Sequence, residues 1–367
     1  MNSNLATQRD ELIVRMKLNS IRGSSHTVAS EIVGYLRKFI AQSRHAGLDE
    51  MLEAVREEGR ALQEADPTEF VVGNMTLSVL KLIREEKLRL DFGDDEPPPA
   101  FLDPVDSLHK LWSRAVGAHG KKGASAKELR QSIVDTLGEF LQEMETARDM
   151  VGGQSTEHIR PRGDVVLTLG ESRTVESFLR HAAASGRKFE LLVAENAPSC
   201  SGTEFARRLK AESESCAGRV ERCQCVRDSE LLSSLPSASK VVLGAKTVLA
   251  DGGFIGVAGT HALCLAAHRL AVPVVVCACF YKLTPKFLSA DDRPEFDRLR
   301  SPAELIPFSE GALVDRVDVY SSSFDYVPPE LVSLYVMQTT GNSPSYVHRM
   351  LAEYYHPDDI SKTDLGE

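Results

Sequence analysis

The sequence predicts an α/β protein in which an all-helical N-terminal domain is followed by a Rossmann-like doubly wound parallel sheet. Apolar residues recur at helical spacing in the first half of the chain. From residue 164 onward, short apolar runs alternate with helical segments, the order that gives βαβ units. The 367 residues are enough for two domains with sizeable cores. We expect the helical domain over 1–154 and the sheet domain over 155–367.

The helical domain is predicted from apolar stripes. Met75, Val79, Leu82 and Ile83 fall on one face of a helix that ends near residue 90. A further long helix is expected over 125–150, closed by two glycines at 152 and 153. Its expected buried stripe consists of Ile133, Leu137, Phe140, Leu141 and Met144.

Residues 91–106 interrupt this helical pattern. The segment reads DFGDDEPPPAFLDPVD, with three successive prolines among several carboxylates. Proline removes a backbone donor and breaks regular structure, and the segment has no amphipathic spacing. We therefore expect an exposed acidic and proline-rich loop within the helical domain.

The sheet domain is predicted from five apolar runs separated by helical segments. Parallel strands covered by helices on both faces read as nearly continuous apolar runs, as four of these do, while RVERCQC repeats the order of strand and helix with a more polar sequence. The predicted strands are DVVLTLG (164–170), KFELLVAE (188–195), RVERCQC (219–225), KVVLGA (240–245) and VPVVVCACF (272–280).

Composition excludes several classes of function. The net charge is −10, from 43 Lys and Arg against 53 Asp and Glu, which argues against broad binding of nucleic acid. No apolar run approaches the roughly 20 residues that cross a bilayer, and the polar N-terminus does not look like a signal peptide. The odd number of cysteines, seven, fits reduced thiols. We expect a cytosolic protein with no membrane contact.

The cysteines include two C-x-C pairs, Cys223/Cys225 and Cys277/Cys279, both in predicted strands. Alternation along a strand points each pair to one face. We expect them to be small buried side chains, with a metal site as the alternative.

Candidate site residues lie in the loops after the predicted strands, where doubly wound sheets bind ligands. In the first loop, Gly170, Ser172 and Arg173 lie at the start of a helix, whose free amides could cradle an anion. In the third, Lys246 could hold a phosphate, or form a structural ion pair. Thr260 and His261 open the next helix, and the histidine fits a hydrogen-bonded structural role better than that of a general base.

Known cofactor and hydrolase motifs are absent from these loops. The sequence contains no G-x-G-x-x-G, no Walker loop, no G-x-S-x-G and no H-E-x-x-H. We therefore expect no cofactor, no metal and no assembled active site.

Several segments resemble one protein family over nearly the whole chain. The sheet-domain segments TLGESRTVESFL, AENAPSCSG, VVLGAKTVLADGGFIGVAGTHALCLAAH and PVVVCACFYKL resemble the regulatory subunits (alpha, beta and delta) of initiation factor 2B. The same domain occurs in methylthioribose-1-phosphate isomerases. VGNMTLSVLKLIREE and the C-terminal FDYVPPELVSLYVMQTTGNSPSYVHRMLAEYYHPDD are similar to the beta branch of the family.

The resemblance to the isomerases fails at the residues that carry their chemistry. Those enzymes depend on a cysteine after the first strand and an aspartate in a later loop. Gly170 stands where the cysteine would be, and Lys246 replaces the aspartate. Isomerisation needs groups that move protons, which glycine lacks. A non-catalytic role is expected, with a sugar-phosphate isomerase or a metabolite-sensing module as the alternatives.

The resemblance implies a regulatory subunit of the guanine-nucleotide exchange complex that acts on initiation factor 2. Its implied partners are the delta, alpha, gamma and epsilon subunits of that complex. It also implies contact with initiation factor 2 through the alpha subunit of that factor, whose phosphorylation the complex senses.

The tyrosine-rich stretch 324–355 is a candidate subunit interface, because obligate interfaces are large and apolar. The alternative is that its side chains form the chain's own core. The residues proposed for the interface are Tyr326, Val327, Leu331, Tyr335, Tyr354 and Tyr355.

Overall fold

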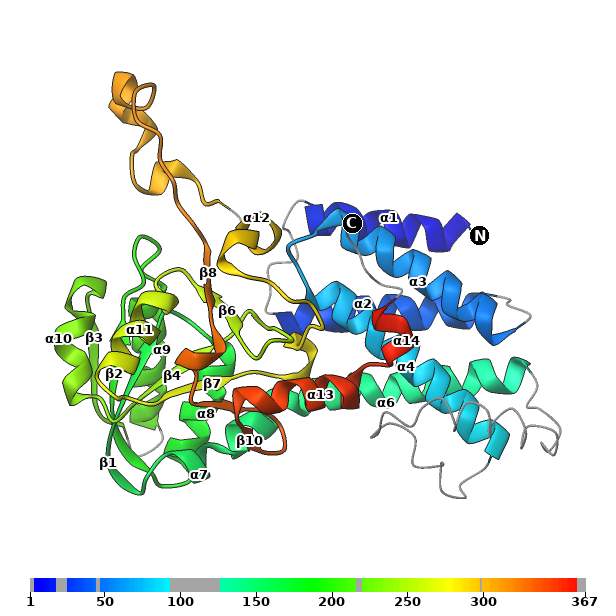
Figure 1. Cartoon of the computed structure of the whole chain (residues 1–367), viewed down its shortest axis with the longest axis horizontal. Coiled ribbons are helices and arrows are strands. Elements are labelled where there is room, and N and C mark those ends of the chain that lie inside the picture. Colours follow the sequence, from blue (N-terminus) through cyan, green and yellow to red (C-terminus); the bar gives the residue numbers. More distant parts are fainter. Residues whose placement is uncertain are drawn as a thin grey trace. The chain divides into compact units, whose positions relative to one another are not determined.

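A computed structural model describes residues 3–17, 25–43, 47–92, 126–215, 220–297 and 299–361 (Figure 1). The chain divides into two compact units. We call them the helical unit (Met1–Asp66, Val71–Glu145 and Met350–Glu367) and the sheet unit (Pro67–Phe70 and Thr146–Arg349). An N-terminal helical region followed by a mostly parallel sheet with flanking helices confirms the predicted fold class.

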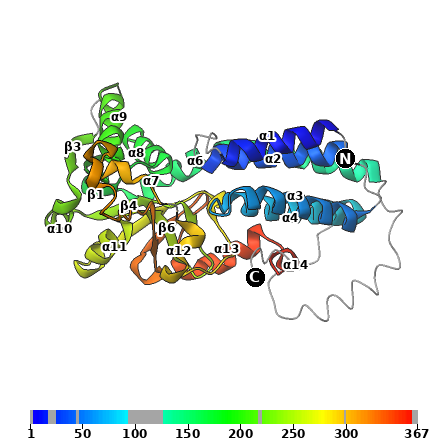
Figure 2. The same cartoon turned by 90° about the horizontal axis from the view of Figure 1, so that it is seen from above.

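The helical unit is built from α1 (Ser3–Lys17), α2 (Ser25–Gln42), α3 (Leu48–Ala65), α4 (Val71–Phe92) and most of α6 (Ala126–Gly153). Helices α1 to α4 run side by side (Figures 1 and 2). The stripe predicted for α6 faces the interior, since Ile133, Leu137, Phe140 and Met144 are buried, and Leu141 is half-buried. The helix ends at the predicted Gly153.

The main sheet of the sheet unit has seven strands in the order β10-β9-β7-β4-β1-β2-β3. All neighbours are parallel except β10 and β9. In this order β4 lies at the centre, with β1, β2 and β3 on one side of it and β7, β9 and β10 on the other. The strands are β1 (Arg162–Leu169), β2 (Lys188–Ala194), β3 (Val220–Val226), β4 (Lys240–Gly244), β7 (Val274–Cys277), β9 (Leu334–Val336) and β10 (Gly341–Asn342).

Helices cover both faces of this sheet, as the apolar runs predicted. α8 (Arg173–Ala184) and α9 (Ser201–Ser215) lie on one face, and α10 (Leu231–Ser234) and α11 (Thr260–Arg269) lie on the other (Figure 2). The strand centres are accordingly buried, including Val166, Leu191 and Val242. The remaining helices are α7 (Ser155–His158), α12 (Arg293–Phe296), α13 (Val347–Tyr354) and α14 (Pro357–Ile360).

A second, three-stranded antiparallel sheet was not predicted. It pairs β5 (Thr247–Val248), β6 (Phe254–Val257) and β8 (Phe324–Val327). A small core packs with it and contains Phe70, Leu249, Ile255, Leu288 and Phe296. Short 3-10 helices are η2 (Asp228–Glu230), η3 (Leu235–Ser237), η4 (Phe280–Lys282), η5 (Ala290–Asp292), η6 (Pro302–Glu304), η7 (Phe308–Leu313), η8 (Pro329–Leu331) and η9 (Pro344–Tyr346).

The units differ from the predicted domains at three points, the first being that Pro67–Phe70 belongs to the sheet unit. The division falls after Glu145, within α6, and the C-terminal residues from Met350 belong to the helical unit. In the predicted loop 91–106, Asp91 and Phe92 complete α4. The rest of that loop lies outside the described residues.

A buried carboxylate holds the C-terminal segment in the helical unit. Asp359 in α14 has no exposed side-chain surface, and it accepts hydrogen bonds from Arg84 Nε (2.8 Å) and Arg56 Nη2 (2.9 Å). Burial alone would raise the pKa of Asp359, but the hydrogen bonds and charge of Arg84, with Arg56, outweigh burial and lower it. The charged carboxylate is therefore the form that binds both arginines.

We predict that Asp359→Asn lowers the free energy of unfolding by about 2 kcal/mol, because it removes the charged acceptor of Arg84 and of the buried Arg56, which keeps only the exposed Glu53 as an acidic partner. Urea unfolding at pH 7 measures the loss. Glu57→Gln, an exposed carboxylate on α3, is the control and should cost less than about 0.5 kcal/mol.

The pH dependence gives a second check on this carboxylate. Because its folded pKa is depressed, its contribution is present above the unfolded pKa of about 3.9 and is lost as the pH falls through the folded value. The stability difference between wild type and Asp359→Asn should therefore shrink below about pH 4. A difference that is constant from pH 7 to pH 3 would contradict the assignment.

Candidate functional site

The first strand-tip loop is shaped by a glycine with a left-handed backbone. Gly170 follows β1 with a φ of 65°. A Cβ at this position would lie 2.9 Å from Asn196 Nδ2, in the loop after β2. Asn196 is itself held, because its amide donates to Asp228 Oδ1 (3.0 Å) and its Nδ2 donates to Ser201 Oγ (3.2 Å). The position has no room for a catalytic side chain.

Ser172 caps the helix that the first loop opens. Its Oγ accepts a hydrogen bond from the amide of Val175 at 3.4 Å, which satisfies one of the free amides of α8. The same hydroxyl lies against Gly244 at the end of β4, where a Cβ would come within 2.1 Å of it. Ser172 therefore joins the first and third loops.

Lys246, in the third loop, is committed to internal partners. Its Nζ donates to the carbonyl of Phe296 at 3.3 Å and lies 4.1 Å from the centre of the Phe324 ring. Burial lowers the pKa of Lys246, and the charges of Glu69 and Asp297 oppose that shift. The lysine thus contacts a carbonyl oxygen and an aromatic ring of its own unit, where an ion pair was the structural role predicted for it.

The start of α11 is occupied by a carboxylate of the chain. Asp325 Oδ2 accepts hydrogen bonds from the amides of Gly259 (2.7 Å) and His261 (3.4 Å). Thr260 is buried, and its hydroxyl donates to the carbonyl of Val257 at 2.5 Å. The anion expected at this helix terminus is therefore supplied from within, by β8.

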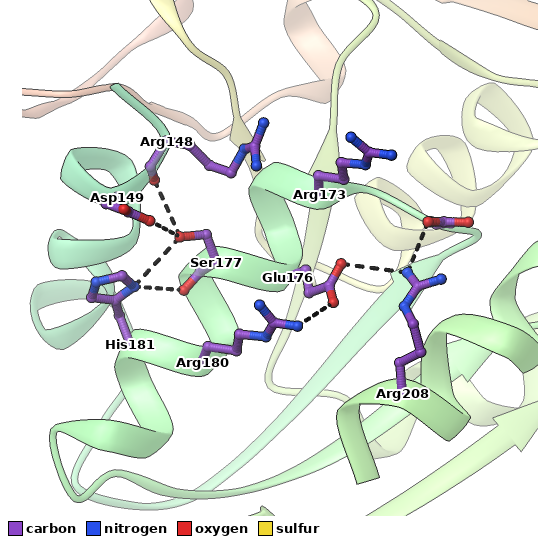
Figure 3. Close-up of a pocket in the computed structure, with 9 residues that line it drawn as sticks. Arg148, Asp149, Arg173, Glu176, Ser177, Arg180, His181 and Arg208 are labelled. Atoms are coloured by element: carbon purple, nitrogen blue, oxygen red, sulfur yellow. Dashed lines mark hydrogen bonds and ion pairs between the residues drawn. The ribbon is translucent and has the colours of Figure 1, made fainter. Parts of the chain in front are cut away.

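A polar pocket of about 550 Å³ opens beside α8 (Figure 3). Its wall is one face of α8, whose residues recur at helical spacing, and it is completed by the loop after β1, the end of α6 and α9. Of the predicted site residues only Arg173 lines it. The lining residues are Arg148, Asp149, Glu171, Arg173, Glu176, Ser177, Arg180, His181 and Arg208.

Arginine–carboxylate pairs dominate this pocket. Arg208 Nη2 lies 2.8 Å from Glu171 Oε1, and Arg180 Nη2 lies 2.7 Å from Glu176 Oε1. The side chains of Arg148 and Arg173 point to the same side of the pocket, away from those pairs (Figure 3). Four arginines face three carboxylates, so the pocket carries an excess positive charge and suits an anion.

The structure thus separates the predicted site residues. Gly170 faces the loop after β2, and Ser172 lies against the end of β4. Lys246 contacts Phe324 at the start of β8, and Thr260 and His261 belong to the capped start of α11. Sequence reasoning missed Asp325 and, among the arginines of the pocket, Arg148, Arg180 and Arg208. The polar residues of α8 at spacings of three and four were the available signal for the pocket.

The residues proposed for a subunit interface lie largely inside the chain. Tyr335 donates its hydroxyl proton to the carbonyl of Gly252 (2.8 Å), and Tyr326 donates to Asp251 Oδ2 (2.6 Å). Tyr326 and Tyr354 are half-buried. This placement supports the alternative that the stretch is core. The fully enclosed side chains are Val327, Leu331, Tyr335 and Tyr355.

The cysteines and the helices show no metal or membrane chemistry in the part of the chain that is described. Cys264, Cys277 and Cys279 are buried thiols, and burial raises the pKa of Cys264 to about 12. Among the described residues, no three His, Cys, Asp or Glu side chains group as they would around a metal ion. No helix of those residues combines the length and the apolar character needed to span a membrane.

We predict that Gly170→Ala destabilises the protein at least about 1 kcal/mol more than Gly163→Ala does. Both glycines have positive φ, which costs a residue with a Cβ about 1 kcal/mol. Only Gly170 faces a held side chain, whereas a Cβ at Gly163 meets open space. Thermal unfolding of the two variants measures the difference. Equal losses of unfolding free energy would contradict the prediction and show that Asn196 moves away from the added Cβ.

Known proteins resemble this chain along its whole length. A sequence model of the Initiation factor 2 subunit family matches residues 20–344. A protein of Dictyostelium discoideum named translation initiation factor eIF2B subunit beta is 31% identical over 96% of this chain and 96% of its own. A ribose 1,5-bisphosphate isomerase of Thermococcus kodakarensis is 27% identical over 68% of this chain and 74% of its own.

Solved structures agree with that relationship. The eIF2B beta structure from Chaetomium thermophilum superposes with a TM-score of 0.73 at 26% identity, covering 97% of this chain and 94% of its own. A chain of the tetrameric eIF2B-beta2-delta2 complex from C. thermophilum gives 0.68 at 25% identity, covering 96% and 95%. Because the family model matches residues 20–344 and a relative is 31% identical over 96% of both chains, the chain belongs to the Initiation factor 2 subunit family.

Proposed function

We propose that this protein is the beta-type regulatory subunit of initiation factor 2B, the exchange factor for initiation factor 2, and that it acts by holding other proteins. The observation that carries the proposal is the full-length similarity to beta subunits, 31% identical over 96% of both chains in one case. The isomerase relative covers less of the chain at lower identity.

The geometry of the strand tips supports a role without catalysis. Gly170 offers no side chain where the resemblance places the isomerases' cysteine, and Asn196 fills the space beside it. Lys246 stands where the resemblance places their aspartate, and its ammonium group is committed to the Phe296 carbonyl and the Phe324 ring. No pair of groups remains at these two positions to move a proton between adjacent carbons of a sugar.

The proposed partners follow from the family. The solved relative is a complex of two beta and two delta subunits, so a delta-type subunit is the first partner proposed. The alpha, gamma and epsilon subunits complete the proposed complex, and initiation factor 2 is bound through its alpha subunit. The chain is proposed to act in the cytosol, where translation takes place.

Holding a substrate is a physical contribution to nucleotide exchange. A ligand or scaffold shifts a conformational equilibrium only by binding one state more tightly than the other. A rigid frame that grips a remote part of initiation factor 2 can favour the nucleotide-releasing state in this way. Phosphorylation adds charge to the gripped part, which changes that preference.

We predict that the chain co-purifies with a co-expressed delta-type subunit in equimolar amounts, because both would bury apolar surface on association. Size-exclusion chromatography with light scattering measures the stoichiometry. The purified chain should also show no conversion of ribose 1,5-bisphosphate or methylthioribose 1-phosphate, measured by phosphorus NMR. Turnover of either compound, or a homodimer indifferent to delta, would refute the proposal.

The arginine pocket supports a second candidate function, the sensing of a phosphate ester. Arg148 and Arg173 point to the same side of a pocket that has excess positive charge. A thermal-shift series with sugar phosphates tests this, since a ligand at 100 times its Kd stabilises the folded state by roughly 2.7 kcal/mol. No shift with any sugar phosphate would count against sensing.

A further inference from the structure

A projecting arm, residues 301–320, concentrates exposed apolar side chains. None of its twenty residues is buried. It carries five of the thirteen large apolar side chains that are exposed among the described residues: Leu305, Phe308, Leu313, Val317 and Tyr320. Phe308 is 69% exposed and Tyr320 is 62% exposed. Such a concentration on a soluble domain marks a surface that another protein covers.

The arm projects from the sheet unit between α12 and β8 (Figure 1, orange). Its internal backbone bonds are local, such as Leu305 N to Pro302 O (3.0 Å) and Val314 N to Gly311 O (3.1 Å). They form the short 3-10 helices η6 and η7, which have no buried residue of their own. The arm thus presents apolar side chains without building a core to enclose them.

The base of the arm is fixed, so its direction is set before any partner binds. Arg300 N donates to Ser321 O at 2.7 Å and closes the neck. Asp297 accepts from the amides of Ser323 (2.8 Å) and Phe324 (3.0 Å). On the other side of the neck, Phe296 is fully buried in the small core. An anchored element loses less conformational entropy on binding than a loose loop does.

We propose that this arm inserts into an apolar groove of a delta-type subunit and is a main element by which this chain binds that partner. The inference rests on the proposed function, and it assigns the arm as the surface of this chain that binds the delta-type subunit. The solved relative that assembles as beta2-delta2 matches 96% of this chain, which includes at least part of the arm. Twenty residues is close to the roughly 20–30 that one side of a standard interface contributes.

The charge of the arm predicts the charge of the groove that would bind it on the delta-type subunit. It carries four carboxylates, Glu304, Glu310, Asp315 and Asp318, and one basic residue, Arg316. A complementary groove is apolar at its centre and rimmed by Lys and Arg side chains, because complementary charges at the rim steer association. The partner predicted here therefore has a basic rim around an apolar groove.

The test compares two triple variants of the full chain, each co-expressed with the delta-type subunit. The arm variant is Leu305→Ser, Phe308→Ser and Leu313→Ser. The control variant is Leu232→Ser, Leu265→Ser and Leu270→Ser, which removes equally exposed leucines from α10 and around α11. We expect the arm variant to weaken binding at least about 30-fold, since buried apolar anchors dominate interface energetics. The control should change binding less than about threefold.

Stability separates lost binding from lost folding. Because the three arm side chains are exposed, the arm variant should melt within about 2 °C of wild type. An arm variant that binds delta as tightly as wild type overturns the inference while leaving the proposed function intact. If wild type itself does not bind delta, the proposed function fails instead.

Two further experiments test which partner binds the arm. Light scattering of the chain alone shows whether the arm pairs with a second copy, and a homodimer that the arm variant abolishes would overturn the choice of delta. Glu310→Lys with Asp315→Lys keeps every apolar side chain and inverts local charge. We expect about tenfold weaker binding to delta from this variant, and unchanged binding would refute the basic rim.

Discussion

Two loops at the carboxyl edge of the parallel sheet, the one that holds Lys246 and the one that opens α11, are occupied by the chain's own charged groups. Asp325 occupies the amides at the start of α11, where an anionic ligand would otherwise bind. Lys246 is held between a carbonyl oxygen and the face of Phe324. A ligand entering these two loops would first have to displace internal partners, so the edge acts as structure.

The same strand that closes the edge also anchors the arm. β8 supplies Asp325 to the start of α11 and Phe324 to Lys246, and it begins immediately after the neck. Asp297 binds the residues at that junction with both carboxylate oxygens. β8 therefore both occupies the start of α11 with Asp325 and supports the base of the arm. Because β8 is held by its pairing with β6, the arm has a rigid base.

Local patterns predicted the regular elements because their signals lie within a few residues of one another. The stripe of α6 and the apolar runs of the parallel strands are of this kind. The small antiparallel sheet was missed because β5 has only two residues and β6 and β8 have four each, too short for a period to show. The bond between Arg84 and Asp359 joins residues 275 positions apart, and nothing local signals it. Likewise, the sequence identifies the charged residues of the loops after the strands, such as Lys246, but it does not indicate that Phe296 and Phe324 are its partners.

The tyrosine-rich stretch shows why composition alone does not locate an interface. Tyr335 is enclosed, and its hydroxyl is satisfied by the carbonyl of Gly252. Tyr326 binds Asp251, whose other oxygen accepts from the amide of Gly253 at 2.7 Å. These bonds fix the turn between β5 and β6, the strand on which β8 pairs. The aromatic residues thus contribute stiffness to the base of the arm, because a satisfied buried hydroxyl restrains what it binds.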